Sequence, residues 1–154
     1  MIRSTTAASL LALMLVLPVP ALAVTDDDLA AAAEFAARKD FLAAKVHSDA
    51  GRYGEAEALL RTADAAEPNN ADILNLLGFV TRKQGRLAEA RGYYDRALAK
   101  NPDHRGAREY RGELFVETGD LTAARAELAE LERICGTTCE EYRELAEVLS
   151  AAGS

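Results

Sequence analysis

Residues 71–104, ADILNLLGFVTRKQGRLAEARGYYDRALAKNPDH, carry the pattern that decides the fold. Apolar residues recur every three or four positions on both sides of Gly85, and this spacing is typical of amphipathic helices. Gly85 can end the first helix because glycine adopts the left-handed conformation without a Cβ clash, and Pro102 ends the second because proline cannot continue a helix. The stretch therefore predicts a helical hairpin. The recurring residues are Ile73, Leu76, Leu77, Val80, Leu87, Ala90, Tyr94 and Ala97.

The same pattern returns at an offset of 34 residues on either side of this stretch. Three columns hold only small residues, one at the predicted helix ends and two where the helices of a hairpin would approach each other. No stretch shows the alternation that is typical of a strand. We therefore predict three stacked hairpins, over residues 37–70, 71–104 and 105–138. The small-residue columns are Gly51, Gly85 and Gly119; Ala44, Gly78 and Gly112; and Ala56, Ala90 and Ala124.

Polar residues indicate where the first helix and two of the later helices begin. Asn70 and Asp103 can each cap the helix that follows a proline. Asp26, Asp27 and Asp28 suit a helix N-terminus by their charge. Because no glycine or proline follows them before residue 50, we expect one long first helix that includes an N-terminal extension over residues 24–36.

The first 23 residues have the three parts of a cleavable signal peptide. Arg3 lies beside the amino terminus, residues 10–17 are an apolar run, and Ala21-Leu22-Ala23 has the small-x-small form of a cleavage site. The run is too short for a membrane anchor, which needs about 20 residues. We expect cleavage after Ala23, a periplasmic or secreted protein, and no membrane insertion after cleavage. With a net charge of −7 the chain repels nucleic acid and anionic membranes, so we expect neither as a partner.

The repeat resembles the tetratricopeptide repeat, whose unit is 34 residues long. This resemblance implies an all-α, right-handed α-solenoid of about three helix pairs, used as a scaffold. Two further stretches, residues 101–110 and 135–142, are similar to small periplasmic tetratricopeptide proteins of proteobacteria, which implies an envelope protein. Leu74 and Thr81 stand where the family usually has Trp and Tyr, and Gly136 replaces the closing Pro of the third unit. The matching residues are Leu74, Leu77, Gly78, Ala90, Tyr94, Ala97 and Pro102.

The resemblance also implies a concave groove, lined by the first helix of each pair, that binds a protein or peptide. Phe41 and Phe79 would be its aromatic anchors, because a desolvated aromatic contributes more binding energy than rim charges. Lys45, Arg82 and Lys83 could bind an acidic side chain or a C-terminal carboxylate. The carboxylate clamp of chaperone-binding relatives is not expected, and a groove whose charges are merely solvated stays an alternative. The groove residues are Phe41, Lys45, Asn75, Phe79, Arg82, Lys83, Glu109 and Glu113.

Cys135 and Cys139 are the only cysteines, and export would place them in an oxidising compartment. Thr138 and Glu141 have the spacing of a capping box, which predicts that a terminal capping helix starts here within residues 139–154. A structural disulfide between the two helix ends is the main prediction. A thiol redox or metal site and a pair of free thiols are the alternatives.

No nucleophile, base and orienting group can be combined from the sequence, and the glycines are explained by helix ends. We therefore expect a non-enzymatic protein that binds a protein or peptide partner and needs no cofactor or metal. A thiol redox or metal-handling protein, and a subunit of a larger enzyme or transport complex, remain alternative functions. An active site without a recognisable motif also stays open, as does the oligomeric state.

Overall fold

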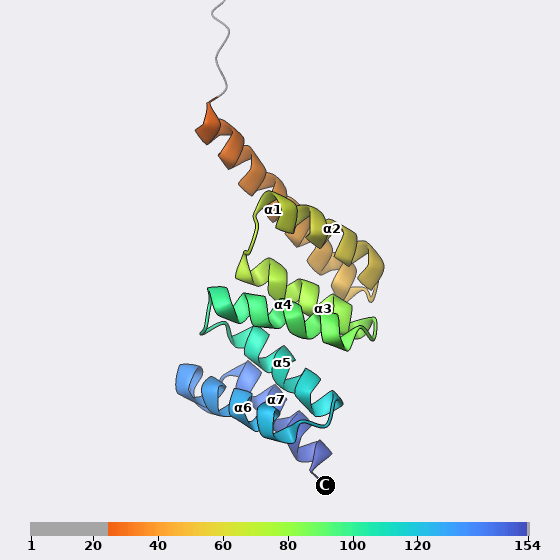
Figure 1. The fold of residues 1–154 in the computed structure, drawn as a ribbon, viewed down its shortest axis with the longest axis vertical. Helices are drawn as coiled ribbons and strands as arrows, with labels where there is room; N and C mark the ends of the chain where they lie inside the picture. Colours follow the sequence, from red (N-terminus) through yellow and green to blue (C-terminus); the bar gives the residue numbers. More distant parts are fainter. Residues whose placement is uncertain (1–24, 154) are drawn as a thin grey trace, which may run out of the picture.

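The computed structural model describes residues 25–153, and within this range it contains seven helices and no strand (Figure 1). Helices α1 to α6 form three antiparallel hairpins stacked along the long axis, and α7 packs on the last one. The predicted all-α solenoid with a C-terminal capping helix is therefore confirmed. The predicted signal peptide lies outside the described residues. The helices are α1 (Asp26–Asp49), α2 (Tyr53–Ala66), α3 (Ala71–Lys83), α4 (Leu87–Lys100), α5 (Arg105–Glu117), α6 (Leu121–Cys135) and α7 (Glu140–Ala152).

Glycines make the turns inside the hairpins, as the 34-residue period predicts. Gly51, Gly85 and Gly119 have φ angles of 72°, 78° and 81°, which lie in the left-handed region. Any residue with a Cβ atom would be strained there. The first helix of each hairpin therefore ends at the same point of the repeat.

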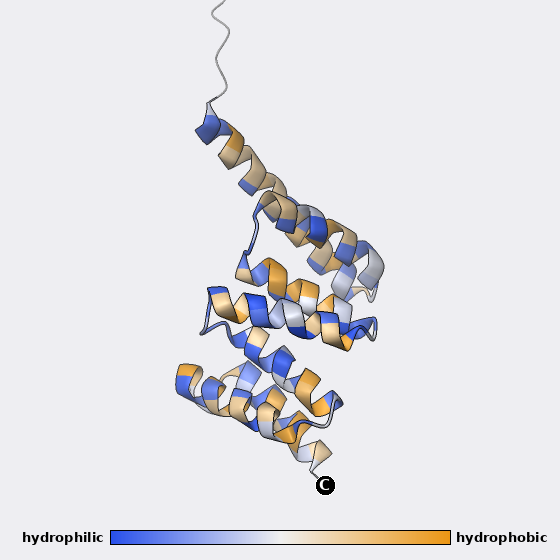
Figure 2. Cartoon of the chain, in the orientation of Figure 1, coloured by the Kyte–Doolittle hydropathy of each residue, from blue (hydrophilic) through white to orange (hydrophobic). Residues whose placement is uncertain are grey.

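The small-residue columns form the seams of the stack. A Cβ atom added to Gly78 would lie 2.4 Å from a ring carbon of Tyr94, and one added to Gly112 would lie 2.5 Å from a methyl carbon of Leu145. Tyr94 and Leu145 are fully buried, so the two glycines admit large side chains of a neighbouring helix. Figure 2 shows hydrophobic residues concentrated on α3, in the middle of the stack.

The helix starts agree with the predictions at two places. Thr25 and Asp28 form a capping box at the start of α1, which is one long helix as expected. The Asn70 side chain accepts hydrogen bonds from the amides of Asp72 and Ile73 and so caps α3.

Two predicted caps are wrong, each by one residue. α5 is capped by His104, whose Nδ1 accepts from the amide of Ala107 at 3.1 Å, while the Asp103 carboxylate pairs with Arg133. At the start of α7 the N-cap is Cys139, without a side-chain hydrogen bond, so Thr138 lies outside the helix. In both cases the helix begins one residue later than the spacing of polar residues suggests.

In the part of the chain that the structure describes, no helix combines the length and the apolar character that crossing a membrane requires.

Candidate functional site

The first helices of the hairpins, α1, α3 and α5, together with α7, form one continuous surface, which we call the first-helix face. Each of these helices contacts the next one directly, although the second helices of the hairpins lie between them in the sequence. The predicted groove residues belong to α1, α3 and α5. The fold therefore brings residues from all three repeats, and from α7, to one surface.

An aromatic row crosses the middle of this face. The ring of Phe79 on α3 lies 5.0 Å from that of Tyr110 on α5, and 6.3 Å from that of Tyr53, which borders the face at the start of α2. The Lys83 ammonium lies 5.3 Å from the centre of the Phe79 ring. Phe79 is only half-buried and Lys83 is exposed. The row therefore offers partly open apolar area beside a cation, at the place where the sequence predicts an anchor.

Phe41 lies further along the same face, toward the N-terminal end. It lines a surface cavity of about 60 Å³ between the first and second hairpins, together with Arg38 from α1 and Asp72 from α3. The neighbouring Lys45 is exposed. Phe41 is therefore placed where a side chain of a partner could contact it.

Arg82 does not offer the open positive charge that the sequence suggests. Its side chain is buried, with an exposed fraction of 4% for the residue, and it forms ion pairs with Glu113 and, at 3.2 Å, with Glu117. Its guanidinium also lies 5.8 Å from the centre of the Tyr110 ring. The middle of the face is therefore less basic than predicted, because two carboxylates of α5 neutralise this cation.

Glu109 is buried at the other end of the face, where α5 meets α7. Burial, together with the nearby carboxylates of Glu144, Glu113 and Glu141, raises the pKa of Glu109 to about 9. One Glu109 carboxyl oxygen, Oε1, and the Oδ1 atom of Asn75 have no hydrogen-bond partner among residues 25–153. At neutral pH this carboxyl group therefore holds a proton instead of presenting a charge to a partner.

The acidic end of the face includes residues that the sequence analysis did not assign to it. Glu141 and Glu144 belong to α7, outside the three repeats. Asp72 and Glu141 both line an open surface hollow at this end, together with His104 and Arg105. Only the docking of α7 on α5 brings its carboxylates here, so the repeat period alone could not indicate them.

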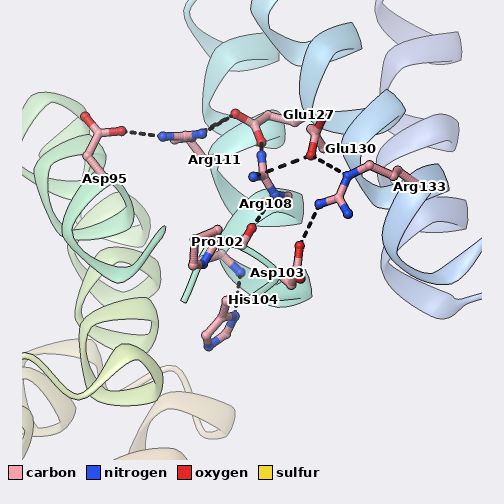
Figure 3. Close-up of polar contacts among 10 residues, drawn as sticks. Asp95, Pro102, Asp103, His104, Arg108, Arg111, Glu127, Glu130 and Arg133 are labelled. Atoms are coloured by element: carbon pink, nitrogen blue, oxygen red, sulfur yellow. Dashed lines mark hydrogen bonds and ion pairs between the residues drawn. The ribbon is translucent and has the colours of Figure 1, made fainter. Parts of the chain in front are cut away.

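A different set of charges connects α5 to the second helices α4 and α6 (Figure 3). Glu127 on α6 is buried and accepts from Arg108 and Arg111 on α5, each at 2.9 Å. Arg111 also pairs with Asp95 on α4 at 2.6 Å. These groups satisfy one another across three helices, so their role is structural.

A disulfide joins Cys135 and Cys139, with their Cα atoms 5.9 Å apart, as predicted. The two sulfurs and a carboxylate oxygen of Glu141 lie within 4.8 Å of one another, so a reduced form would offer three potential metal ligands. Glu141 is also 3.4 Å from Arg105. In the disulfide form both sulfurs are bonded to each other and are unavailable as thiolates.

The double variant Cys135→Ser/Cys139→Ser is expected to lower the free energy of unfolding by about 2 kcal/mol. The bond restricts the unfolded chain, and the effect is modest because the loop that it closes is very short. Urea denaturation, followed by circular dichroism, measures this change. A structural bond should also stay intact in a mild thiol buffer. Rapid exchange of the bond with glutathione, combined with unchanged stability of the double variant, would instead support the redox alternative.

Comparison with known proteins identifies the repeat. The sequence model of the tetratricopeptide repeat matches residues 41–98 and again residues 80–137. A TPR repeat-containing protein of Pseudomonas aeruginosa is 42% identical over 53 residues, which are 34% of this chain and 9% of that protein. Human tetratricopeptide repeat protein 7B is 29% identical over 112 residues, which are 73% of this chain and 13% of the human protein. The chain thus spans a small part of the length of these relatives.

Solved structures share the fold. The first TPR of Spaghetti, bound to an HSP90 peptide, has a TM-score of 0.69 and 19% identity, and covers 79% of this chain and 96% of its own. The Yersinia enterocolitica chaperone SycD, in complex with a peptide of the translocator YopD, has a TM-score of 0.64 and 16% identity, covering 75% and 87%. YrrB, a TPR protein with an unusual peptide-binding site, has a TM-score of 0.60 and 22% identity, covering 82% and 71%.

Proposed function

Because the chain belongs to the tetratricopeptide repeat family, we propose that it is an exported, non-enzymatic scaffold that binds a segment of another protein along its first-helix face. The observation that carries this proposal is the partly open aromatic row around Phe79. It lies in the middle of a surface that extends over three repeats, and Lys83 beside it has no carboxylate partner among the described residues. Solved proteins of this fold, named above, hold peptides, which supports the same use here.

The charges on the face favour a partner segment with a particular polarity. Lys83 is an open cation on α3, whereas Arg82 is neutralised. Carboxylates dominate toward α5 and α7, where Glu117 and Glu144 are exposed. A segment with acidic side chains near α3 and basic ones near α7 would complement this distribution, because complementary potentials favour association and suppress wrong partners.

Location in the periplasm, or secretion, is part of the proposal and rests on residues 1–23. The three-part pattern of this segment supports export, and the disulfide is of the kind that persists in an oxidising compartment. Mass determination of the protein purified from the cell envelope tests this step. A mature form that begins at Val24 is expected, whereas an unprocessed chain would contradict it.

The variant Lys83→Glu tests the binding surface. It reverses an exposed charge beside Phe79 without touching the core, so the protein should fold normally and bind its partner at least tenfold more weakly. Lys100→Glu on α4 is the matched control, since it makes the same change away from the first-helix face. The measurement is quantitative affinity purification from envelope extract with the wild type and both variants.

The expected result is a defined protein that both the wild type and Lys100→Glu enrich and that Lys83→Glu loses. Equal recovery with all three proteins would contradict the proposed surface. Equal loss with both variants would also contradict it, because the effect would then follow net charge and not position.

A further inference from the structure

The four large apolar side chains that are exposed among residues 25–153 all lie on α1. Phe35, Leu42 and Val46 have exposed fractions of 74%, 50% and 63%, and Leu29 has 59%. Since each residue advances about 100° around a helix, Phe35, Leu42 and Val46 fall within one narrow stripe, and Leu29 lies about 120° away from it. The opposite side of α1 carries Ala37, Ala44 and Ser48, which are buried. The stripe is therefore an apolar surface distinct from the face that packs on α2.

The repeat explains why no residue of the described range 25–153 covers this stripe. Val46 has its counterparts, one and two periods later, in Val80 and Leu114, whose exposed fractions are 0% and 2%. Val80 belongs to a core cluster that includes residues of α2, and Leu114 to one that includes residues of α4, so the preceding hairpin contributes to the core in which each of them lies. Within the described chain no hairpin precedes α1. Figure 1 shows its N-terminal part extending beyond α2.

We propose that α1 pairs with α1 of a second copy of this chain in an antiparallel arrangement, so that the stripe of Phe35, Leu42 and Val46 on each copy packs against the N-terminal part of α1 of the other copy. The second copy thereby covers the exposed apolar side of α1, the first helix of the described stack of hairpins. An arrangement with twofold symmetry is self-complementary, because each contact occurs twice.

The charges on one flank of the stripe favour this occupant. Asp27 and Glu34 are acidic and seven residues apart, and Arg38 and Lys45 are basic and seven residues apart, so all four lie on one side of the helix. All four are exposed, and none forms an ion pair within residues 25–153. In an antiparallel pair, Asp27 faces Lys45 of the second copy in the same register in which Glu34 faces Arg38. In this one alignment, each of the four charges of one copy therefore faces an opposite charge of the other copy.

The same alignment suits the apolar residues. Leu42 of one copy lies beside Ala31 of the other, and the two Phe35 rings lie near the symmetry axis. A large residue opposite a small one lets the helices approach closely. In a parallel pair with twofold symmetry, this flank of one copy would lie diagonally away from the same flank of the other copy, so these four charges could not pair with one another.

Sedimentation velocity over a range of concentrations, on protein purified after expression of the full-length sequence, tests the proposal. The wild type is expected to form a dimer, and Leu42→Glu is expected to be a monomer with unchanged circular dichroism. Leu29→Glu is the matched control, because it places the same charge on an exposed apolar position outside the stripe and should leave the dimer intact.

A charge exchange identifies the antiparallel register. Asp27→Lys and Lys45→Glu should each raise the dissociation constant of the dimer by about tenfold, and the double variant should restore it to within about threefold of the wild type. The two positions are about 27 Å apart along one helix, so the rescue can only act between copies. A wild type that stays monomeric, a double variant that fails to recover, or a Leu29→Glu variant that dissociates like Leu42→Glu would each overturn the proposal.

Discussion

The variant Gly78→Ala is expected to lower the free energy of unfolding by about 3 kcal/mol, although it adds only one methyl group. Alanine favours a helix by about 1 kcal/mol over glycine, so propensity alone predicts the opposite sign. The new Cβ atom would lie 2.4 Å from a ring carbon of Tyr94, whose side chain is the largest that is fully buried among residues 25–153. Helices α3 and α4 cannot move apart to make room for this atom without losing the packing contacts between them.

Thermal or urea denaturation of two variants isolates this effect. Gly92→Ala is the matched control, because it makes the same change in α4, where a Cβ atom would meet nothing within 4 Å. It should raise the free energy of unfolding by up to about 1 kcal/mol. In a Tyr94→Leu background the cost of Gly78→Ala should shrink, since the two residues share one contact. Equal effects of Gly78→Ala and Gly92→Ala would contradict the close packing of this seam.

The variant Glu109→Gln is expected to be more stable than the wild type at pH 8, by about 2 kcal/mol or more, and to lose this advantage toward pH 5. Burial raises the pKa of Glu109 in the folded protein to about 9, from an ordinary value of 4.5. Between these two values the folded state binds more protons than the unfolded state, so the wild type loses stability as the pH rises. Glutamine has the shape of the protonated acid and removes this dependence.

The measurement is urea denaturation of both proteins at several pH values between 5 and 9. Glu147→Gln provides the control, since Glu147 is an exposed carboxylate on α7 and its replacement should change little at any pH. An advantage of Glu109→Gln that is the same at every pH would contradict the raised pKa. A loss of stability at pH 8 would contradict it as well, because it would mean that Glu109 is stabilised in its charged form.

The fold could be predicted from the helical spacing and the 34-residue period, because the repeat places small residues at the positions where neighbouring helices contact each other. Gly78 and Gly112 occupy one column of the period, and both admit a large buried side chain. The last repeat is the exception in detail, since Gly112 receives Leu145 of α7 and not a residue of its own hairpin. The prediction succeeded because each hairpin needs only its neighbour to bury its apolar face.

The charges of the candidate site could not be predicted in the same way. Arg82 is matched to Glu113 and Glu117 of the following hairpin, and Glu109 meets Glu144 of the capping helix. These pairings depend on which side chains share the space between two helices, and a repeat position specifies only the direction of a side chain. The position rule placed Arg82 on the correct helix, but it could not show that its charge is already neutralised.

Site-specific photo-crosslinking in cells that produce the protein tests most directly whether the first-helix face binds a partner. A crosslinking residue is introduced at Lys83 or at Asp72, both exposed on this face, and at Ala99, exposed on α4. The account predicts that the same protein is crosslinked from Lys83 and Asp72 and not from Ala99. A partner that is crosslinked from Ala99 and from neither of the other two positions would contradict it.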